Sequence, residues 1–270
     1  MSSLIKKINK DASNISGVRP DFLYKNVLDQ ERYISVLSHV KNKSVLDCAC
    51  GVGWGSHIMA MSGAKSVLGI DLSASAIKTA SRFYNSKAVT YVQNDINQIN
   101  KEDCFDVITS FETLEHVENP LEFLHTLRNL SHSDSIFFLS TPNGYCFKHH
   151  GDKPYNPYHL EEYQKDELLE MFECSGWVVE DYLGQYPMKE GSEEVEEYRD
   201  FIYSFWLDKK RVKKFGLVFS LLSKVFRRLI NKLIKDPAHN NSCAPVIIKN
   251  GYQPAYHYFK LKPRAKGSFE

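Results

Sequence analysis

The sequence lacks the features that mark several classes of protein. Its longest apolar run, around Phe215–Leu222, is far shorter than the roughly 20 residues that a membrane-spanning helix needs. The first ten residues, MSSLIKKINK, contain no apolar stretch of the kind found in secretion signals. Glycine and proline number only 14 and 10 of 270 residues, which excludes collagen-like and low-complexity chains. We therefore expect a cytoplasmic protein whose 43% hydrophobic residues form one sizeable core.

Paired cysteines are also missing. The six cysteines are scattered, and Cys48-Ala49-Cys50 has no second pair at the spacing of a zinc site. We expect reduced structural thiols rather than a disulfide framework or cysteine-bound metal.

Neither sign of charge dominates, because 34 Lys and Arg face 33 Asp and Glu. The balance gives no indication of a nucleic-acid partner. It conceals a division, however, since residues 188–270 hold 17 basic and 9 acidic side chains while the first 187 hold 17 and 24. The two parts of the chain therefore differ in electrostatic character.

Short apolar runs rich in Val, Ile and Phe alternate with helical patterns. The predicted strands are Ser44–Ala49, Ser66–Asp71, Val89–Gln93, Phe105–Phe111, Ser135–Ser140, Trp177–Leu183 and Ala255–Leu261. The predicted helices between them are Gly53–Ser62, Ala74–Tyr84, Leu121–Leu130 and Lys165–Cys174. This alternation predicts a doubly wound, mostly parallel, seven-stranded Rossmann-like α/β sheet, with ligands at the carboxyl ends of its strands.

Four regions follow from this pattern. We expect an N-terminal helical segment over residues 1–43, a core over 44–187, a basic helical insertion over 188–250, and a last strand with a tail over 251–270. Within the insertion, Glu193–Leu207 and Lys213–Lys235 have helical patterns.

The sharpest local signal is VLDCACGVGWGS, residues 45–56, in which a strand is followed by Gly51, Gly53 and the start of a helix. Such a turn brings the backbone close to a ligand. Gly55 falls one position too early for the nicotinamide-nucleotide fingerprint. Asp47 lies at the strand tip, where it would repel a pyrophosphate but suit a cation. Both departures disfavour a dinucleotide.

Two further acids end the next two strands. Asp71 comes about 20 residues after the glycine turn, where a carboxylate accepts hydrogen bonds from ribose hydroxyls. Asp95 ends the third strand, where it suits an adenine amino group. Together with the glycine turn, the two acids describe a site for an adenosine without phosphates.

With these residues the sequence resembles the class I S-adenosylmethionine-dependent methyltransferases over roughly residues 31–184. It is most similar to small-molecule O-methyltransferases of the ubiquinone pathway and of bacterial surface-polysaccharide synthesis. The strings that carry this are ERY (31–33), GIDLS (69–73), FDVITSFETLEHVENP (105–120) and NPYHLEEY (156–163). The resemblance implies S-adenosyl-L-methionine as cofactor, bound by Arg32, Asp47, Gly51, Gly53, Asp71, Leu72, Asp95, Ile96 and Phe111.

The catalytic candidates follow the fourth strand. Glu112, Glu115 and His116 have i, i+3, i+4 spacing and share a face if the turn is helical. His116 is then a general base supported by a glutamate, or all three bind a divalent ion, or the cluster only orients the loop. His159, in the long loop after the fifth strand, is a second candidate base, acceptor-binding group or structural residue.

The segment Lys209–Lys235 contains ten Lys and Arg and no acidic residue. At 100° per residue its apolar side chains fall on one side and most of its charges on the other. Three interpretations stay open: its apolar face packs on the core or on a second subunit of a homodimer, it lies on an anionic membrane, or it binds phosphates of a nucleotide- or lipid-linked sugar.

The function indicated is O-methylation of a small-molecule hydroxyl, with the resemblance pointing to a saccharide or glycoconjugate in surface-polysaccharide synthesis. A quinone or phenol is the alternative acceptor, and a non-catalytic cofactor-binding subunit is the alternative role. A nucleic-acid methyltransferase is disfavoured, because FETLEH (111–116) stands where an amino-methylating enzyme has its Asn/Asp-Pro-Pro-aromatic string.

Overall fold

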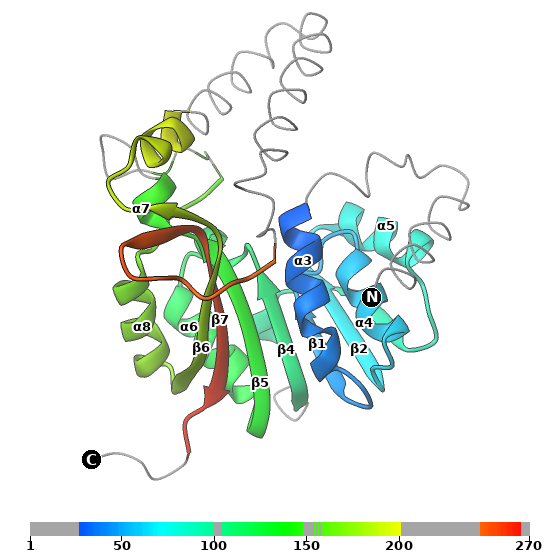
Figure 1. The fold of residues 1–270 in the computed structure, drawn as a ribbon. Coiled ribbons are helices and arrows are strands. Elements are labelled where there is room, and N and C mark those ends of the chain that lie inside the picture. Colours follow the sequence, from blue (N-terminus) through cyan, green and yellow to red (C-terminus); the bar gives the residue numbers. More distant parts are fainter. Residues whose placement is uncertain are drawn as a thin grey trace, which may run out of the picture.

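A computed structural model describes residues 27–99, 104–147, 154, 156, 158–200 and 244–265. Strands and helices alternate along the first part of the chain (Figure 1). The strands are β1 (Ser44–Cys48), β2 (Ser66–Asp71), β3 (Val89–Gln93), β4 (Phe105–Phe111), β5 (Ser131–Pro142), β6 (Trp177–Lys189) and β7 (Tyr252–Pro263). The α-helices are α3 (Val27–Val36), α4 (Trp54–Met61), α5 (Ala74–Phe83), α6 (Pro120–Asn129), α7 (Gly144–Phe147) and α8 (Lys165–Cys174), with 3-10 turns η1 (Leu37–His39), η2 (Ile96–Gln98) and η3 (Leu114–His116).

The strands form one seven-stranded sheet in the order β3-β2-β1-β4-β5-β7-β6. Strands β1 to β5 are parallel, and β7 runs antiparallel to both β5 and β6. The strand order reverses between β1 and β4, so their carboxyl ends flank a topological switch point. Open α/β sheets bind their ligands at such a point.

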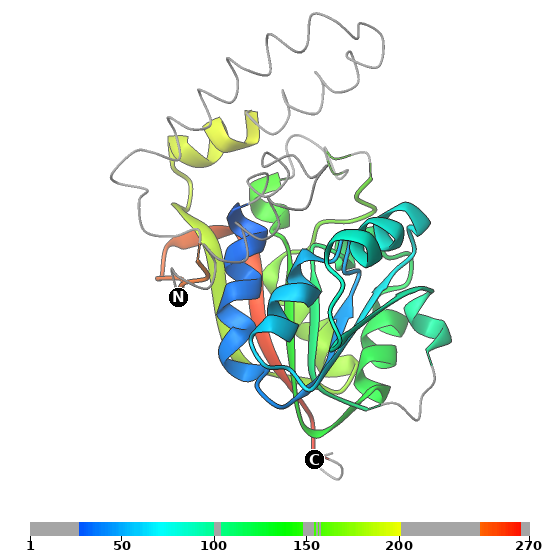
Figure 2. The same ribbon diagram turned by 90° about the vertical axis from the view of Figure 1, so that its right-hand side faces the viewer.

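Helices cover both faces of the sheet (Figure 2). Neighbouring residues of each central strand point to opposite faces, as the period of a strand requires. Val45 and Val107 pack with α3 and α4, whereas Leu46 and Ile108 pack with α6 and α8. Because both faces are buried, the strands read as nearly continuous apolar runs.

Local sequence signals set where two helices begin. The Ser73 hydroxyl caps α5 by accepting a hydrogen bond from the Ala76 N–H at 3.3 Å. Asn119 caps α6 in the same way, and Pro120 occupies its first turn. These caps fix where the helices that follow β2 and β4 begin, and β4 is one of the two strands that flank the switch point.

The predicted α/β sheet is confirmed, and β2, β3 and β4 have the predicted bounds. Strands β5, β6 and β7 are longer than predicted. For β6 and β7 the reason is their pairing from Trp177↔Pro263 to Lys189↔Tyr252, which carries β6 past the core boundary expected at residue 187. For β5 the amino-terminal extension includes Ser131, which pairs with Phe105 of β4.

Of the two helical patterns in the insertion, the first is helical over residues 193–200. The segment Lys209–Lys235 lies outside the described residues. Within the described part of the chain, no helix has the length and apolar character needed to cross a membrane.

Candidate cofactor and acceptor site

The chain turns sharply after β1. Ala49, Gly51 and Gly53 all have positive φ, at 59°, 54° and 86°. A Cβ on Gly53 would lie 2.6 Å from the Cβ of Ala80 and 2.8 Å from the ring of Tyr91, so this glycine allows close packing. A Cβ on Gly51 would meet nothing within 4 Å. Gly51 therefore presents bare backbone to open space, as a close ligand contact requires.

Asp71 is held at the end of β2 by the same turn. One carboxylate oxygen accepts from the Gly51 N–H at 2.9 Å, and the other accepts from the Ser73 N–H at 2.8 Å. Each oxygen keeps a lone pair for a further donor. The carboxylate is thus fixed by backbone on both sides and available to a ligand.

A cleft of about 430 Å³ opens beside these residues. It contains four of the predicted cofactor residues, Asp71, Leu72, Asp95 and Ile96. Leu72 is 71% exposed, so its apolar side chain is open to whatever occupies the cleft. The other residues that line it are Cys48, Ala49, Asn94, Asn97, Thr113, His116, Val117, Glu118, Asn119, Glu122, Phe123 and Ile70.

Asp47 does not line this cleft, contrary to the sequence-based expectation of a ligand contact. It is completely buried and accepts hydrogen bonds from the hydroxyls of Tyr33 at 3.0 Å, Ser56 at 2.5 Å and Thr109 at 2.8 Å. Burial raises its pKa to about 6, against the opposing effect of these three donors. Asp47 therefore ties α3, α4 and β4 together beneath the glycine turn.

Arg32, Phe111 and the two glycines of the turn, Gly51 and Gly53, are also not among the residues that line the cleft. Phe111 packs against Tyr33 on the α3 face of the sheet, with ring centroids 4.9 Å apart. Arg32 is 1% exposed, and its guanidinium binds Asp29 at 2.7 Å and Glu112 at 3.2 Å. Its Nη2 has no hydrogen bond among the described residues and so keeps both of its N–H donors for an anionic group.

Glu112, Glu115 and His116 do not share one helical face. The 3-10 turn η3 spans only Leu114–His116, and Glu112 precedes it with φ of 52°. Glu112 is thereby turned toward Arg32 and accepts from the Ser140 hydroxyl at 2.9 Å. The shared helical face expected from the spacing is therefore not formed, and a catalytic part for Glu112 stays a prediction.

His159 takes the place of Glu112 in the cluster that does form. Glu115, His116 and His159 each have an atom that could bind a metal ion, and these three atoms lie within 4.8 Å of one another. The two histidine rings make an edge contact at 4.8 Å. His159 is held from behind by Glu162, a fully buried carboxylate whose oxygen lies 2.6 Å from its Nδ1. Because His116 also lines the cleft, this cluster adjoins the cofactor residues.

Burial shifts the titration of this cluster. It lowers the pKa of His116, an effect that the Tyr158 carbonyl opposes and His159 reinforces. It raises the pKa of Glu115 far above the usual range, and Glu112 adds to the shift. It raises the pKa of Glu112 as well, against the attraction of Arg32. Burial therefore favours the neutral imidazole of His116, which is able to take a proton or a cation.

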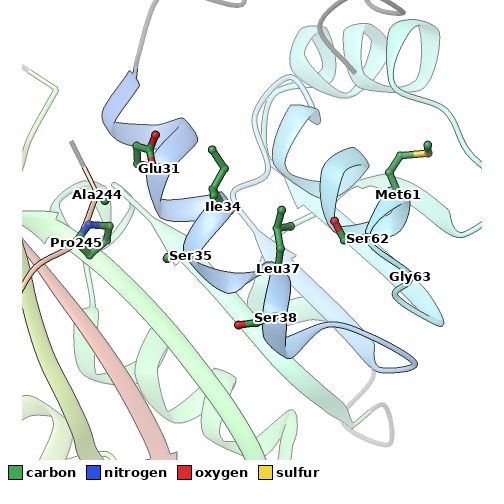
Figure 3. Close-up of a pocket in the computed structure, with 10 residues that line it drawn as sticks. All are labelled: Glu31, Ile34, Ser35, Leu37, Ser38, Met61, Ser62, Gly63, Ala244 and Pro245. Atoms are coloured by element: carbon green, nitrogen blue, oxygen red, sulfur yellow. The ribbon is translucent and has the colours of Figure 1, made fainter. Parts of the chain in front are cut away.

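A larger hollow, of about 780 Å³, lies elsewhere on the molecule (Figure 3). It is formed by α3, the end of α4 and the segment at Ala244 and Pro245, and it shares no residue with the cleft. Glu31 is the one ionisable side chain among the described residues that line it. Catalysis needs several polar groups that converge on one point. The residues that line the cleft provide them and those that line the hollow do not, so the smaller cleft is the candidate site.

Four residues that shape the site were given no role from the sequence, although Tyr33 lies in the ERY string and Glu162 in NPYHLEEY. Tyr33 and Tyr91 pack around the glycine turn, Thr141 donates to Glu115 at 2.9 Å, and Glu162 orients His159. Only Glu162 had a usable signal, since it lies three residues after His159 in the NPYHLEEY string. The others are long-range contacts without a local pattern.

Comparisons with known proteins agree with this geometry. Residues 26–182 match the family described as a methyltransferase domain. A probable S-adenosylmethionine-dependent methyltransferase of Mycolicibacterium smegmatis is 29% identical over 143 residues, covering 53% of this chain and 54% of that protein. The ubiquinone biosynthesis O-methyltransferase of Glaesserella parasuis is 38% identical over 109 residues, which cover 37% of this chain and 46% of that protein. The chain thus spans about half the length of these relatives.

Solved structures share the fold at low identity. The S-adenosylmethionine-dependent methyltransferase of Mesorhizobium loti aligns with a TM-score of 0.53 and 16% identity, over 87% of this chain and 99% of that one. The [4+2]-cyclase SpnF aligns with a TM-score of 0.54 and 14% identity, over 87% of this chain and 82% of that one. One fold therefore carries different activities, and function has to be argued from the site.

The chain belongs to the methyltransferase domain family, and its sheet is that of the class I S-adenosylmethionine-dependent enzymes. The cofactor suits the residues present. Gly51 leaves room for close approach, Asp71 would hold the ribose, and Leu72, Asp95 and Ile96 would border the adenine. When bound, S-adenosylmethionine supplies a methyl group on a sulfonium.

Proposed function

We propose that this protein transfers a methyl group from S-adenosylmethionine to a hydroxyl oxygen of a small molecule. The observation that carries the proposal is the position of His116, which lines the cleft with Asp71 and Asp95 and also contacts His159. An acceptor beside the cofactor would meet two imidazoles. A hydroxyl has to lose its proton on methylation, and an imidazole base or a cation that the imidazoles hold assists this loss.

We propose a saccharide or glycoconjugate as the acceptor. Two buried polar atoms have no hydrogen bond among the described residues: Glu115 Oε1, in the cluster with His116, and Nη2 of Arg32, whose charge acts on Glu115. A hydroxyl-rich ligand satisfies such groups, whereas an apolar one leaves them unpaired at a cost of about 1–3 kcal/mol each. Synthesis of a surface polysaccharide is the corresponding biological role.

A quinone or phenol is the second candidate acceptor. It is favoured by the relatives that are named ubiquinone biosynthesis O-methyltransferases, of which the Glaesserella parasuis protein is one. Both acceptors require the same cofactor cleft and differ in what lies beyond it. A role as a non-catalytic cofactor-binding subunit is distinguished from both by the absence of turnover.

The experiment is methyl transfer from radiolabelled S-adenosylmethionine to a panel of nucleotide sugars, oligosaccharides and catechols. Asp71→Ala, which removes the ribose-binding carboxylate, is the matched control for contaminating enzymes. We expect label in a saccharide with the natural chain and none with the variant. Label only in a catechol would overturn the acceptor class, and cofactor binding without any transfer would support the regulatory role.

The basic segment Lys209–Lys235 lies outside the described residues, and contact with an anionic membrane stays a prediction. Its ten positive charges are the supporting observation. Flotation with acidic and with neutral liposomes tests it, and an equal lack of binding to both at low salt would refute it. Homodimer formation is likewise a prediction, for sedimentation to test.

A further inference from the structure

The loop that carries His159 is fastened directly to the turn that carries Glu115 and His116. The Leu160 N–H donates to the Glu115 carbonyl at 2.7 Å, and His116 Nδ1 lies 2.7 Å from the Tyr158 carbonyl. These bonds join residues more than 40 positions apart. They bring one carboxylate and two imidazoles to within 4.8 Å of one another.

Each imidazole has one nitrogen already engaged. A carbonyl oxygen only accepts, so the bond to Tyr158 requires a proton on His116 Nδ1 and leaves Nε2 with its lone pair. The Glu162 carboxylate, with its oxygen 2.6 Å from Nδ1 of His159, likewise holds the proton on Nδ1 and leaves Nε2 of His159 with its lone pair. Carbonyl and carboxylate partners behind a histidine are the usual supports of metal-binding imidazoles, since they fix the tautomer and raise ligand basicity.

Glu115 supplies an oxygen that lacks a partner. The side chain is 1% exposed, Oε2 accepts from the Thr141 hydroxyl at 2.9 Å, and Oε1 has no hydrogen bond among the described residues. A buried carboxylate oxygen without a partner is costly. Arg32 does not meet this need with an ion pair, because its guanidinium pairs with Asp29 and Glu112.

We propose that Glu115, His116 and His159 bind a divalent transition-metal ion beside the cofactor cleft. Two imidazoles and one carboxylate favour ions such as Zn²⁺, Co²⁺ or Mn²⁺ over Mg²⁺ and Ca²⁺, which prefer all-oxygen sites. Glu112 is excluded from the ligand set by its ion pair with Arg32 and its bond to Ser140.

The ion's role rests on the proposed function, although its binding does not. Three protein ligands leave coordination positions open, as in catalytic rather than structural metal sites. Since His116 also lines the cofactor cleft, those positions suit acceptor oxygens. This narrows the substrate class to acceptors with two neighbouring oxygens, such as a vicinal diol of a sugar.

The test uses the full chain without a polyhistidine tag, stripped with a chelator and titrated with Co²⁺ under anaerobic conditions. We expect one equivalent to bind and to give visible absorption bands, a readout independent of turnover. His159→Ala and Glu115→Gln should each weaken Co²⁺ binding by at least about 100-fold, and Glu162→Gln, which acts through His159, by about 10-fold to 100-fold. S-adenosylmethionine binding by each variant verifies that it is folded.

Two control variants make the ligand set falsifiable. His132→Ala removes a surface histidine that also faces a carboxylate, Asp106 at 3.4 Å, and should leave Co²⁺ binding unchanged. Glu112→Gln should retain binding within about threefold, whereas a loss equal to that of Glu115→Gln would overturn the assignment. So would absence of Co²⁺ binding by the natural chain. If the chelator-treated protein binds no metal and still transfers the methyl group, the proposed metal site is refuted and the proposed function stands.

Discussion

Replacing Asp47 by asparagine tests the electrostatics beneath the glycine turn. Asparagine has nearly the shape of aspartate, and its carbonyl oxygen keeps the two bonds that Tyr33 and Thr109 donate to Oδ1. Its amide nitrogen donates to Ser56, reversing the third bond. The substitution therefore removes a titrating group with little loss of packing.

The magnitude follows from the pKa of Asp47, which burial raises from its ordinary 3.8 to about 6. Ionising this buried carboxyl thus costs about 3 kcal/mol more in the folded protein than in the unfolded chain. The pKa of Asp47 is higher in the folded protein than in the unfolded chain. The stability that the protonated carboxyl contributes is therefore fully present below pH 3.8 and is lost as the pH rises through about 6. About half of that loss, roughly 1.5 kcal/mol, falls between about pH 5 and about pH 8.

Urea unfolding of the cofactor-free protein at the two pH values measures the effect. We expect the stability of Asp47→Asn, relative to the natural chain, to rise by about 1.5 kcal/mol on going from about pH 5 to about pH 8. Asp106→Asn is the control. Despite burial, bonds from Ser44 lower the pKa of Asp106, so its stabilisation is lost only at more acidic pH and the curve of that variant should parallel the natural one.

Cofactor affinity separates this supporting role from ligand contact. Since Asp47 does not line the cleft, Asp47→Asn should bind S-adenosylmethionine within about threefold of the natural chain. Identical pH dependence of stability in variant and natural chain, or a loss of affinity as large as that of Asp71→Ala, would refute the reasoning.

Three further predictions concern the same core. Asp71→Ala should weaken S-adenosylmethionine binding by about 10-fold to 100-fold in equilibrium dialysis, because the variant would lack the cleft carboxylate that we propose as the partner of the ribose hydroxyls. Gly53→Ala should destabilise the fold by more than about 2 kcal/mol, since its Cβ would lie 2.6 Å from Ala80, whereas Gly51→Ala, which meets open space, should mainly reduce cofactor affinity. Trp177→Phe should cost about 1–3 kcal/mol in urea unfolding, because the hydrogen bond from the indole N–H to the Leu124 carbonyl is lost and the smaller ring leaves a cavity in the core.

The central sheet could be predicted because its signals are local. Buried parallel strands are continuous apolar runs, and Val89–Gln93 and Phe105–Phe111 end where their runs end. The amino-terminal extension of β5 from Ser131 was missed, because its polar residues His132 and Asp134 resemble a turn. Antiparallel pairing with β7 extended β6 as well, and such pairing has no signature in the sequence of either strand.

The cofactor side of the site was more predictable than the acceptor side. Asp71, Leu72, Asp95 and Ile96 follow strand ends, so the topology alone brings them to one cleft. Glu112 was misplaced because its positive φ turns the chain out of helical spacing.

The partners on the acceptor side are distant in sequence. The pairing of Arg32 with Glu112 and the contact of His116 with His159 join residues 80 and 43 positions apart. No window of sequence reports such contacts, and only the folded chain brings them together.

The most direct test of the central claim is the chemical environment of the transferred methyl group. S-adenosylmethionine labelled with ¹³C in its methyl is incubated with the protein and the acceptor found in the panel, and the product is examined by NMR. We predict a ¹³C shift typical of a methyl ether, with correlation to a sugar ring proton. A shift typical of an N-methyl or C-methyl group would contradict O-methylation at this site.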